Sequence, residues 1–160
     1  MTIYLATDHA GFEMKEKIKE FLKSQKYIVK DCGPESFVPT DDYPDYISLA
    51  AQAVAKHPKD RAIIFGGSGQ GEAMVANRYH GVRAAVFYGP EKPLGSIEGE
   101  GTESTDPYDI VRLTRTHNDA NALSIGARFV SLEEAKEVVL MWLKTSFSSN
   151  ERHKRRIAKF

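Results

Sequence analysis

The chain has 160 residues, a length typical of one domain with a substantial buried core. Its 22 lysines and arginines balance 22 aspartates and glutamates, so no overall field favours binding to nucleic acid or to an anionic membrane. A single cysteine excludes an internal disulfide framework and fits a reducing cytoplasm. The N-terminus carries neither a basic segment nor a long apolar run, so we expect no signal peptide and no membrane-spanning helix. These observations predict one cytoplasmic domain over residues 1–160.

Short apolar runs alternate with amphipathic stretches along the chain, which predicts alternating strands and helices. The expected strands cover residues 3–6, 27–32, 62–65, 82–87 and 122–125. The expected helices cover residues 12–24, 45–55, 72–78 and 132–145, followed by a basic terminal helix over 150–160. Elements that alternate in this way form a parallel sheet with helices on both faces. Ligands of such a sheet bind at the carboxyl ends of its strands.

One segment interrupts this alternation. Residues 88–105 are rich in glycine, proline, serine and glutamate, a composition typical of surface loops. A loop of this length is either mobile or a lid over a functional site.

The most informative motif follows the third predicted strand and reads Gly66-Gly67-Ser68-Gly69-Gln70-Gly71-Glu72. Glycines between a strand and a helix let backbone N–H groups approach an anion closely. The motif is not a P-loop, because no Lys-Ser/Thr pair follows, and its spacing differs from the dinucleotide fingerprint. A carboxylate at Glu72, where a nucleotide-binding loop places a lysine, indicates proton transfer. The alternatives are a turn that uses glycine for geometry alone and a Glu72 that only complements the helix dipole.

Two histidine-containing turns are further candidates. Asp8 and His9 follow the first predicted strand, so they should lie at the same sheet edge as the glycine motif. His117 and Asn118 precede the fifth predicted strand, where an ordinary polar turn is the alternative. The five histidines show no metal-ligand spacing with cysteine or acid, so we expect no metal.

The basic C-terminal segment allows two interpretations. Arg152 and Arg156 are four residues apart, so they share one helix face and are suited to hold a phosphate. A solvated basic surface is the alternative. Nucleic-acid binding is disfavoured because the net charge is zero and no aromatic residues are interleaved with the basic ones.

Taken together, the motifs resemble the type B ribose-5-phosphate isomerase family, which includes the galactose-6-phosphate isomerase subunits. The residues that carry the resemblance are Asp8-His9-Ala10-Gly11, Asp42-Tyr43-Pro44, the glycine motif, Ala76-Asn77-Arg78, Gly81-Val82-Arg83-Ala84, His117-Asn118-Asp119-Ala120-Asn121, Gly126-Ala127-Arg128 and Arg152-His153. The match covers nearly the whole chain in order. It implies a three-layer, Rossmann-like α/β/α fold with a five-stranded parallel sheet and a C-terminal helix. It also implies a homodimer, or a tetramer made of two such dimers, with each site at a subunit interface.

The resemblance further implies a cofactor-free isomerase that interconverts an aldose phosphate and its ketose phosphate. Many members carry a cysteine base at the position of Gly66. A second subgroup has, like this chain, Gly-Gly-Ser-Gly and a glutamate four residues after the serine, so Glu72 is the implied base, with Ser68 as the nearby hydroxyl. His117 would open the sugar ring and Asp8 would contact the sugar oxygens.

The implied substrate-binding residues complete this set. They are His9, Arg128, Arg152 and Arg156 for the phosphate, Asn118 and the amides of Gly67, Gly69 and Gly71 for the developing enediolate, and Tyr43 for the pocket wall. Ribose 5-phosphate is the expected substrate. A six-carbon or four-carbon sugar phosphate, or a non-catalytic role in sugar-phosphate binding, are the alternatives. The segment 88–105 is longer than the family usually has, so we expect it to be an insertion.

Overall fold

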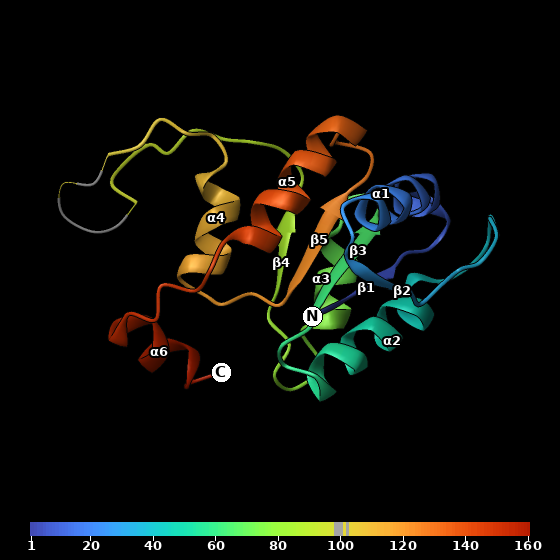
Figure 1. Ribbon diagram of the computed structural model, residues 1–160, viewed down its shortest axis with the longest axis horizontal. Coiled ribbons are helices and arrows are strands. Elements are labelled where there is room, and N and C mark those ends of the chain that lie inside the picture. Colours follow the sequence, from blue (N-terminus) through green and yellow to red (C-terminus); the bar gives the residue numbers. More distant parts are fainter. Residues whose placement is uncertain (98–100, 102) are drawn as a thin grey trace.

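The centre of the molecule is a five-stranded parallel sheet with the strand order β2-β1-β3-β5-β4 (Figure 1). The computed structural model describes residues 1–97, 101 and 103–160. The strands are β1 (Thr2–Ala6), β2 (Ile28–Asp31), β3 (Arg61–Gly66), β4 (Ala84–Phe87) and β5 (Ala122–Gly126). The three inner strands β1, β3 and β5 are apolar and almost wholly buried, as parallel strands covered on both faces must be.

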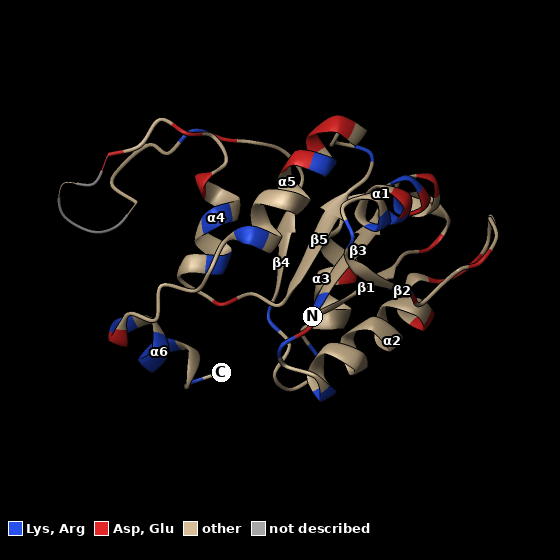
Figure 2. Ribbon diagram, viewed as in Figure 1, with Lys and Arg blue, Asp and Glu red and all other residues tan. Residues whose placement is uncertain are grey.

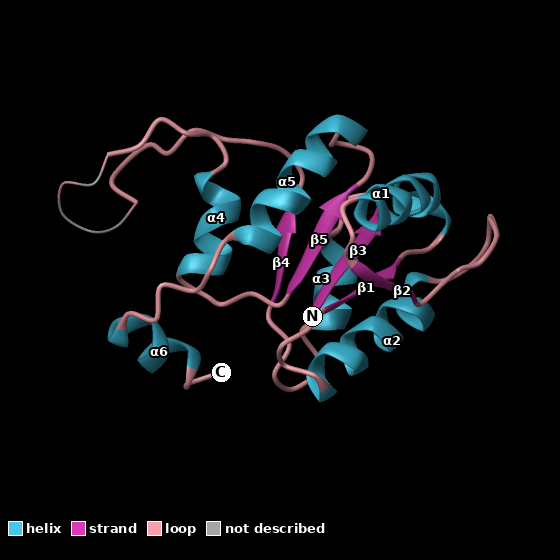
Figure 3. Cartoon of the chain, in the orientation of Figure 1, coloured by secondary structure: helices cyan, strands magenta, loops and turns pink. Residues whose placement is uncertain are grey.

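Helices cover the sheet on both faces and complete the predicted three-layer fold (Figure 3). One face packs against α1 (Phe12–Ser24), α4 (Asp109–Thr116) and α5 (Leu132–Lys144). The other face packs against α2 (Tyr43–Lys56) and α3 (Gln70–Ala76). A 3₁₀ turn, η1 (His9–Gly11), follows β1, and the chain ends with the short helix α6 (Glu151–Ile157). The predicted fold class is therefore confirmed.

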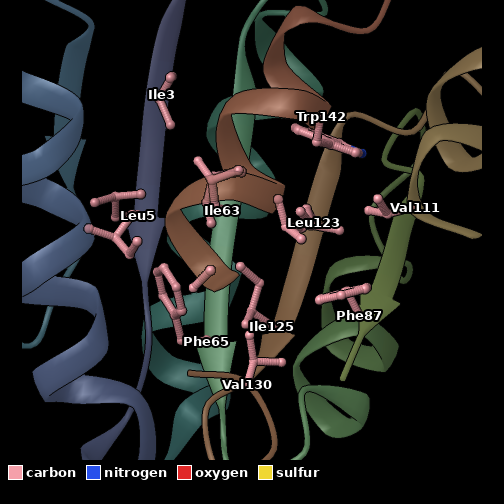
Figure 4. Packing of buried hydrophobic residues seen from close by; sticks show 14 of the residues in the cluster. Ile3, Leu5, Ile63, Phe65, Phe87, Val111, Leu123, Ile125, Val130 and Trp142 are labelled. Atoms are coloured by element: carbon pink, nitrogen blue, oxygen red, sulfur yellow. The ribbon is translucent and has the colours of Figure 1, made fainter. Parts of the chain in front are cut away.

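The two faces of the sheet are filled by alternate residues of the same strands, because strand side chains point to opposite faces with a period of two. Figure 4 shows one layer, in which Leu5, Ile63 and Leu123 pack on the side of α1 and α5. The fully buried Trp142 of α5 closes this layer, and its indole N–H donates to Thr114 Oγ1 at 3.0 Å. Truncating a buried side chain of this layer to alanine costs about 2–5 kcal/mol of stability, so the strand ends that carry the functional loops rest on a rigid core.

Strand β4 begins two residues later than expected, and the terminal helix α6 ends three residues earlier. Three other helices differ more clearly from the sequence-based expectation. Helix α4 was not predicted, because only one turn of it contributes to the core, where Val111 is buried. Ion pairs of Arg112 with Asp106 and Asp109 support it instead of a long apolar stripe. Helix α2 begins at Tyr43, earlier than expected, because a proline is tolerated in its first turn.

The third difference concerns α3. This helix begins at Gln70, two residues before the predicted start at Glu72, directly after Gly69. Gly69 has φ +78°, a left-handed conformation that favours glycine. The turn therefore uses one glycine for geometry, and Glu72 lies within the first helical turn.

The segment between β4 and α4 has the character predicted for residues 88–105. Its described residues contain neither helix nor strand, and Leu94 is fully exposed. Residues 98–100 and 102, which belong to the same predicted segment, lie outside the described part of the chain. Among the described residues, no helix is long and apolar enough to cross a membrane.

Candidate active site

Three loops meet at the carboxyl edge of the sheet, where β1, β3 and β5 end. They line an open cavity of about 530 Å³. Of the predicted site residues, the cavity brings together Asp8, His9, Tyr43, Gly67, Ser68, Gly71, Glu72 and Arg128; Ala10 and Phe129 line it as well. Neither Ala10 nor the exposed Phe129 was predicted, because an alanine and a phenylalanine carry no chemical signal in a sequence.

The carboxylate of Glu72 is buried against the backbone of Gly66. The residue is 5% exposed, and a Cβ atom on residue 66 would lie 1.8 Å from Glu72 Oε1. Gly66 therefore leaves free the space that this carboxylate occupies. Burial raises the pKa of Glu72 above its ordinary value, and the neighbouring Asp8 carboxylate raises it further. A buried carboxyl with a raised pKa is suited to accept and return a proton.

The glycine loop is held in place from the neighbouring strand. Ser124 Oγ donates to the carbonyl of Gly69 at 2.5 Å, which places Gly69 behind the cavity and not in its wall. The N–H groups of Ala127 and Arg128 donate to the carbonyls of Gly66 and Gly67 at 2.8 and 3.2 Å. The loop that follows β5 is therefore tied to the loop that follows β3.

Two glycines of the loop allow larger side chains to approach the backbone. The guanidinium carbon of Arg128 lies 3.3 Å from where a Cβ of Gly67 would be. The Tyr43 hydroxyl lies 2.7 Å from the corresponding position of Gly71. Arg128 and Tyr43 thus cover the glycine loop from two sides, as expected for a cavity wall. Ser68 is exposed at the cavity, and its Oγ accepts the N–H of Gln70 at 3.4 Å.

Asp8 caps η1 and His9 is its first residue, and both are fixed by hydrogen bonds. Asp8 Oδ1 accepts the N–H of Ala10 at 2.9 Å, which orients the carboxylate at the start of η1. The Asp41 carboxylate lies 2.9 Å from His9 Nδ1 and accepts the His9 backbone N–H at 2.8 Å. Asp41 was not predicted from the sequence, where two adjacent aspartates before Tyr43 look like an ordinary helix start.

The same residues are the only described group that has the geometry of a metal site. Ligand atoms of Asp8, His9 and Asp41 all lie within 4.8 Å of one another, which is close enough to hold a cation. The hydrogen bond of His9 Nδ1 to Asp41 occupies the histidine nitrogen that faces the two carboxylates. A cation at this position would have to displace the proton on Nδ1.

The predicted ring-opening histidine lies at the opposite end of the sheet. His117 ends α4 just before β5, and its ring stacks on the ring of His153 from α6, with centroids 4.1 Å apart. Asn118 is exposed, and it lines a second cavity of about 670 Å³ that lies beside the start of β4. Neither residue lines the cavity that contains Glu72.

Two arginines fix the turn that carries His117 and Asn118. Arg115 and Arg83 bind the Asp119 carboxylate from two sides, at 2.7 and 3.0 Å. Arg83 Nε also donates to the carbonyl of Asn118 at 3.0 Å. These contacts hold Asp119 at φ +45°, a conformation that aspartate adopts only when its surroundings enforce it.

The basic terminal helix joins this second cluster. Figure 2 shows the lysines and arginines of α6, which Figure 1 places near the end of α4 and away from the carboxyl edge. Arg152 Nε lies 3.3 Å from His153 Nε2, and Arg156 is exposed one turn further along. His117, Asn118, Arg152 and Arg156 thus form an amino-edge cluster.

The two clusters are far apart within one chain. Strand β5 separates them, and its five residues span about 13 Å at roughly 3.3 Å per residue. The structure therefore brings together eight of the thirteen predicted site residues at the carboxyl edge. It leaves Gly69 and the four amino-edge residues outside that cavity.

The family of this chain follows from a comparison with known protein families. The model of the ribose/galactose isomerase family matches residues 3–93 and 104–160. The chain belongs to this family. The resemblance found in the sequence motifs is thereby confirmed, and the chain is an isomerase by family. The match is interrupted at residues 94–103, inside the segment that the sequence predicts to be an insertion.

Individual members of the family match the chain over nearly its whole length. It is 36% identical over 157 residues to ribose-5-phosphate isomerase B of Mycobacterium leprae. This match covers 98% of this chain and 86% of that protein. The solved structure of ribose-5-phosphate isomerase B from Mycoplasma genitalium, with bound ribulose 5-phosphate, has a TM-score of 0.84 and 36% identity. This match covers 99% of this chain and 92% of the other. The enzyme from Thermotoga maritima has a TM-score of 0.82 and 37% identity, with 99% and 95% covered.

Proposed function

We propose that this isomerase interconverts ribose 5-phosphate and ribulose 5-phosphate, with Glu72 as the base. The observation that carries the proposal is the Glu72 carboxylate, buried against Gly66 in a glycine-lined cavity at the carboxyl edge. The relatives named ribose-5-phosphate isomerase B support the choice of substrate. The relative solved with ribulose 5-phosphate supports the choice of product.

Glu72 transfers one proton between two neighbouring carbons. Its carboxylate takes the proton from C2 of the open-chain aldose, and the electron pair of that C–H bond forms the C1–C2 double bond of an enediolate. The pair of the C1 carbonyl bond moves onto O1 as the double bond forms. The protonated Glu72 then returns the proton to C1, while the C2 hydroxyl gives up its proton to O1 and becomes the ketone. The reaction needs the deprotonated form of Glu72 at its start. Because its pKa is raised, kcat should fall as the pH decreases through that raised value.

The enediolate carries its negative charge only during the reaction. The amides of Gly67 and Gly71, which line the cavity, and the side chain of Asn118 are our candidates to stabilise it, whereas Gly69 lies behind the cavity wall. Hydrogen bonds from Ser124, Ala127 and Arg128 hold the glycine loop before substrate binds, so little reorganisation is needed. A preorganised donor of this kind typically contributes a factor of about 10²–10³ to the rate.

A complete site requires a second copy of the chain. Ring opening by His117 and phosphate binding by Arg152 and Arg156 involve residues of the amino-edge cluster. Within one chain this cluster lies at the opposite end of β5, a strand about 13 Å long, from the cavity that contains Glu72. We propose a homodimer in which the carboxyl edge of one chain faces the amino-edge cluster of its partner. His9 and Arg128 then contribute phosphate contacts from the first chain, Asp8 contacts the sugar oxygens, and Ser68 and Tyr43 line the pocket.

Proton NMR in D₂O tests the reaction and its base together. Wild-type protein with ribose 5-phosphate should form ribulose 5-phosphate and exchange the C2 proton for deuterium. Glu72→Gln should abolish both, while Glu133→Gln, which changes an exposed carboxylate on α5, should leave both unchanged.

Each outcome of this experiment has a clear meaning. If wild-type protein converts only a six-carbon or four-carbon sugar phosphate, the proposed substrate is wrong. If it converts none of these, the catalytic proposal is wrong. Normal exchange in Glu72→Gln would remove Glu72 from the role of base. The cytoplasmic location and the single domain over residues 1–160 remain predictions.

A further inference from the structure

Asp41 is a buried carboxylate next to the cavity that neither the sequence motifs nor the proposed mechanism uses. Its side chain is 6% exposed, whereas that of His9 is 33% exposed and lines the cavity. One oxygen of Asp41 contacts both the His9 backbone N–H and His9 Nδ1, at 2.8 and 2.9 Å. Two contacts to one residue fix both the position of the backbone and the orientation of the ring.

The chemistry of this contact determines which proton His9 carries. An ionised carboxylate only accepts hydrogen bonds, so Nδ1 must be the donor. In a neutral imidazole, Nε2 would then carry a lone pair and could only accept. In an imidazolium, Nε2 carries a second proton and can donate to an anion. A phosphate oxygen beside His9 is therefore bound well only by the imidazolium form.

Several other charged or titratable groups lie near His9. These are Asp8 on the same turn, with its carboxylate 3.8 Å from Nδ1, and Glu72, Tyr43 and Arg128, which line the same cavity, together with Glu13 and Lys17 of α1, which line an adjoining one. The hydrogen bond to Asp41 is the largest influence and raises the pKa of His9. The Asp8 carboxylate acts in the same direction, and partial burial acts against both.

Asp41 belongs to the loop of residues 32–42, which joins β2 to α2 and is anchored where it leaves β2. Lys15 of α1 is fully buried, and its ammonium donates to both carboxylate oxygens of Asp31 at 2.8 and 2.7 Å. It also donates to the carbonyl of Pro34 at 2.9 Å. At the far end, the loop runs directly into α2 at Tyr43. Asp41 is therefore part of a fixed frame around His9.

We propose that Asp41 is a positioning residue that holds His9 as an imidazolium, with Nε2–H available to the phosphate of the substrate. Asp41 acts through His9 and does not touch the substrate. This inference rests on the proposed function only for the identity of the phosphate; the pairing of the two side chains stands by itself. The buried Asp41 carboxylate thus determines the charge of His9, which forms part of the cavity wall.

Histidine NMR tests the pairing without turnover. The imidazole proton of His9, assigned with His9→Asn, should titrate at a lower pH in Asp41→Asn than in wild type. Asp45→Asn is the matched control, because it removes an exposed carboxylate four residues along the chain. Inorganic phosphate should shift the His9 resonance in wild type and much less in Asp41→Asn at the same pH. An unchanged His9 titration in Asp41→Asn would overturn the proposal.

Kinetics tests the consequence for the substrate. In Asp41→Asn the KM for ribose 5-phosphate should rise about tenfold at neutral pH, the scale of one lost charge-assisted contact, while kcat changes little. KM should rise with increasing pH in both proteins, because His9 loses its second proton, and this rise should begin at lower pH in Asp41→Asn. An equal rise of KM in Asp45→Asn would overturn the proposal.

A double-mutant cycle covers the possibility that Asp41→Asn disturbs the loop. If Asp41 acts through His9, the substitution should raise KM little in a His9→Asn background. Fully additive effects would overturn the proposal, as would activity that EDTA removes and Zn²⁺ restores, because the cluster would then be a metal site. If wild-type protein fails to convert ribose 5-phosphate, the proposed function fails, whereas the NMR titration still decides the pairing.

Discussion

The polar side chains at the two ends of the sheet are held in place by different parts of the structure. At the carboxyl edge, Glu72 lies on the first turn of α3 and is buried against the last residue of β3, Gly66. At the amino edge, His117 stacks on His153 of the terminal helix α6, and the turn that follows is held by arginines. The first cluster is positioned by the core of its own chain. The second is presented outward on a turn and a short helix, which is suited to contact with another molecule.

The two clusters differ in how precisely their side chains must be placed. Proton transfer between adjacent carbons requires placement within a fraction of an ångström, which a packed core supplies. Phosphate binding by long basic side chains tolerates more variation. We therefore expect substitutions that displace or remove the Glu72 carboxylate to act on kcat, and substitutions that weaken phosphate contacts, on α6 or at His9, to act mainly on KM.

The largest effect should come from mixing two inactive variants. Glu72→Gln damages the carboxyl-edge cluster and His117→Ala damages the amino-edge cluster. If each site combines one cluster from each chain, a mixture that exchanges subunits should recover up to about a quarter of wild-type activity, since half of the dimers are mixed and each has one intact site. A mixture of Glu72→Gln with Asp8→Asn, which damage the same cluster, should recover nothing. Activity that stays at background in both mixtures would refute the shared site.

The next effect concerns the contact between Gly66 and Glu72. Gly66→Ala places a Cβ atom 1.8 Å from Glu72 Oε1, so the carboxylate must move. A displacement of this size should lower kcat by about 100-fold, measured as ribulose 5-phosphate formation. Gly95→Ala is the control, because nothing lies within 4 Å of its added Cβ atom. Normal kcat in Gly66→Ala would show that the position of the carboxylate does not matter.

A smaller effect is expected at the terminal helix. Arg156→Ala should raise the KM for ribose 5-phosphate about tenfold by removing a charge-assisted phosphate contact, with kcat nearly unchanged. Arg155→Ala removes the same charge from the neighbouring exposed position and should leave KM unchanged. Steady-state kinetics of both variants decide whether α6 contributes a specific contact or only a basic surface.

The smallest effect is on stability. Burial raises the pKa of Glu72, so its ionisation costs more in the folded chain than in the unfolded one. The free energy of unfolding of wild type should therefore fall as the pH rises through that pKa. At neutral pH, Glu72→Gln should be more stable by about 1 kcal/mol, or roughly 2–4 °C in Tm. At acid pH, where Glu72 is protonated in both states, the difference should vanish. Thermal unfolding at both pH values measures this.

The sequence predicted the sheet and much of the site for identifiable reasons. Long apolar strands and the glycine motif are local signals, and the edge of a parallel sheet brings the residues after each strand together. The helix α4 was missed because its eight residues bury little apolar surface. Asp41 was missed because its partner His9 is 32 residues away in the chain. The separation of His117 from Glu72 follows from the sheet direction, but the completion of a site by two chains rested on resemblance alone.

The close contact of Gly66 with Glu72 also restricts how such a site can change over generations. A cysteine at residue 66 would need the space that the glutamate occupies, so the two bases exclude each other within one chain. A lineage that exchanges one base for the other must alter both positions. If residue 66 changes first, the glutamate is displaced, and if Glu72 changes first, the site has no base until the cysteine arrives. The packing of a single glycine thus makes the choice of base at residue 72 depend on the side chain at residue 66.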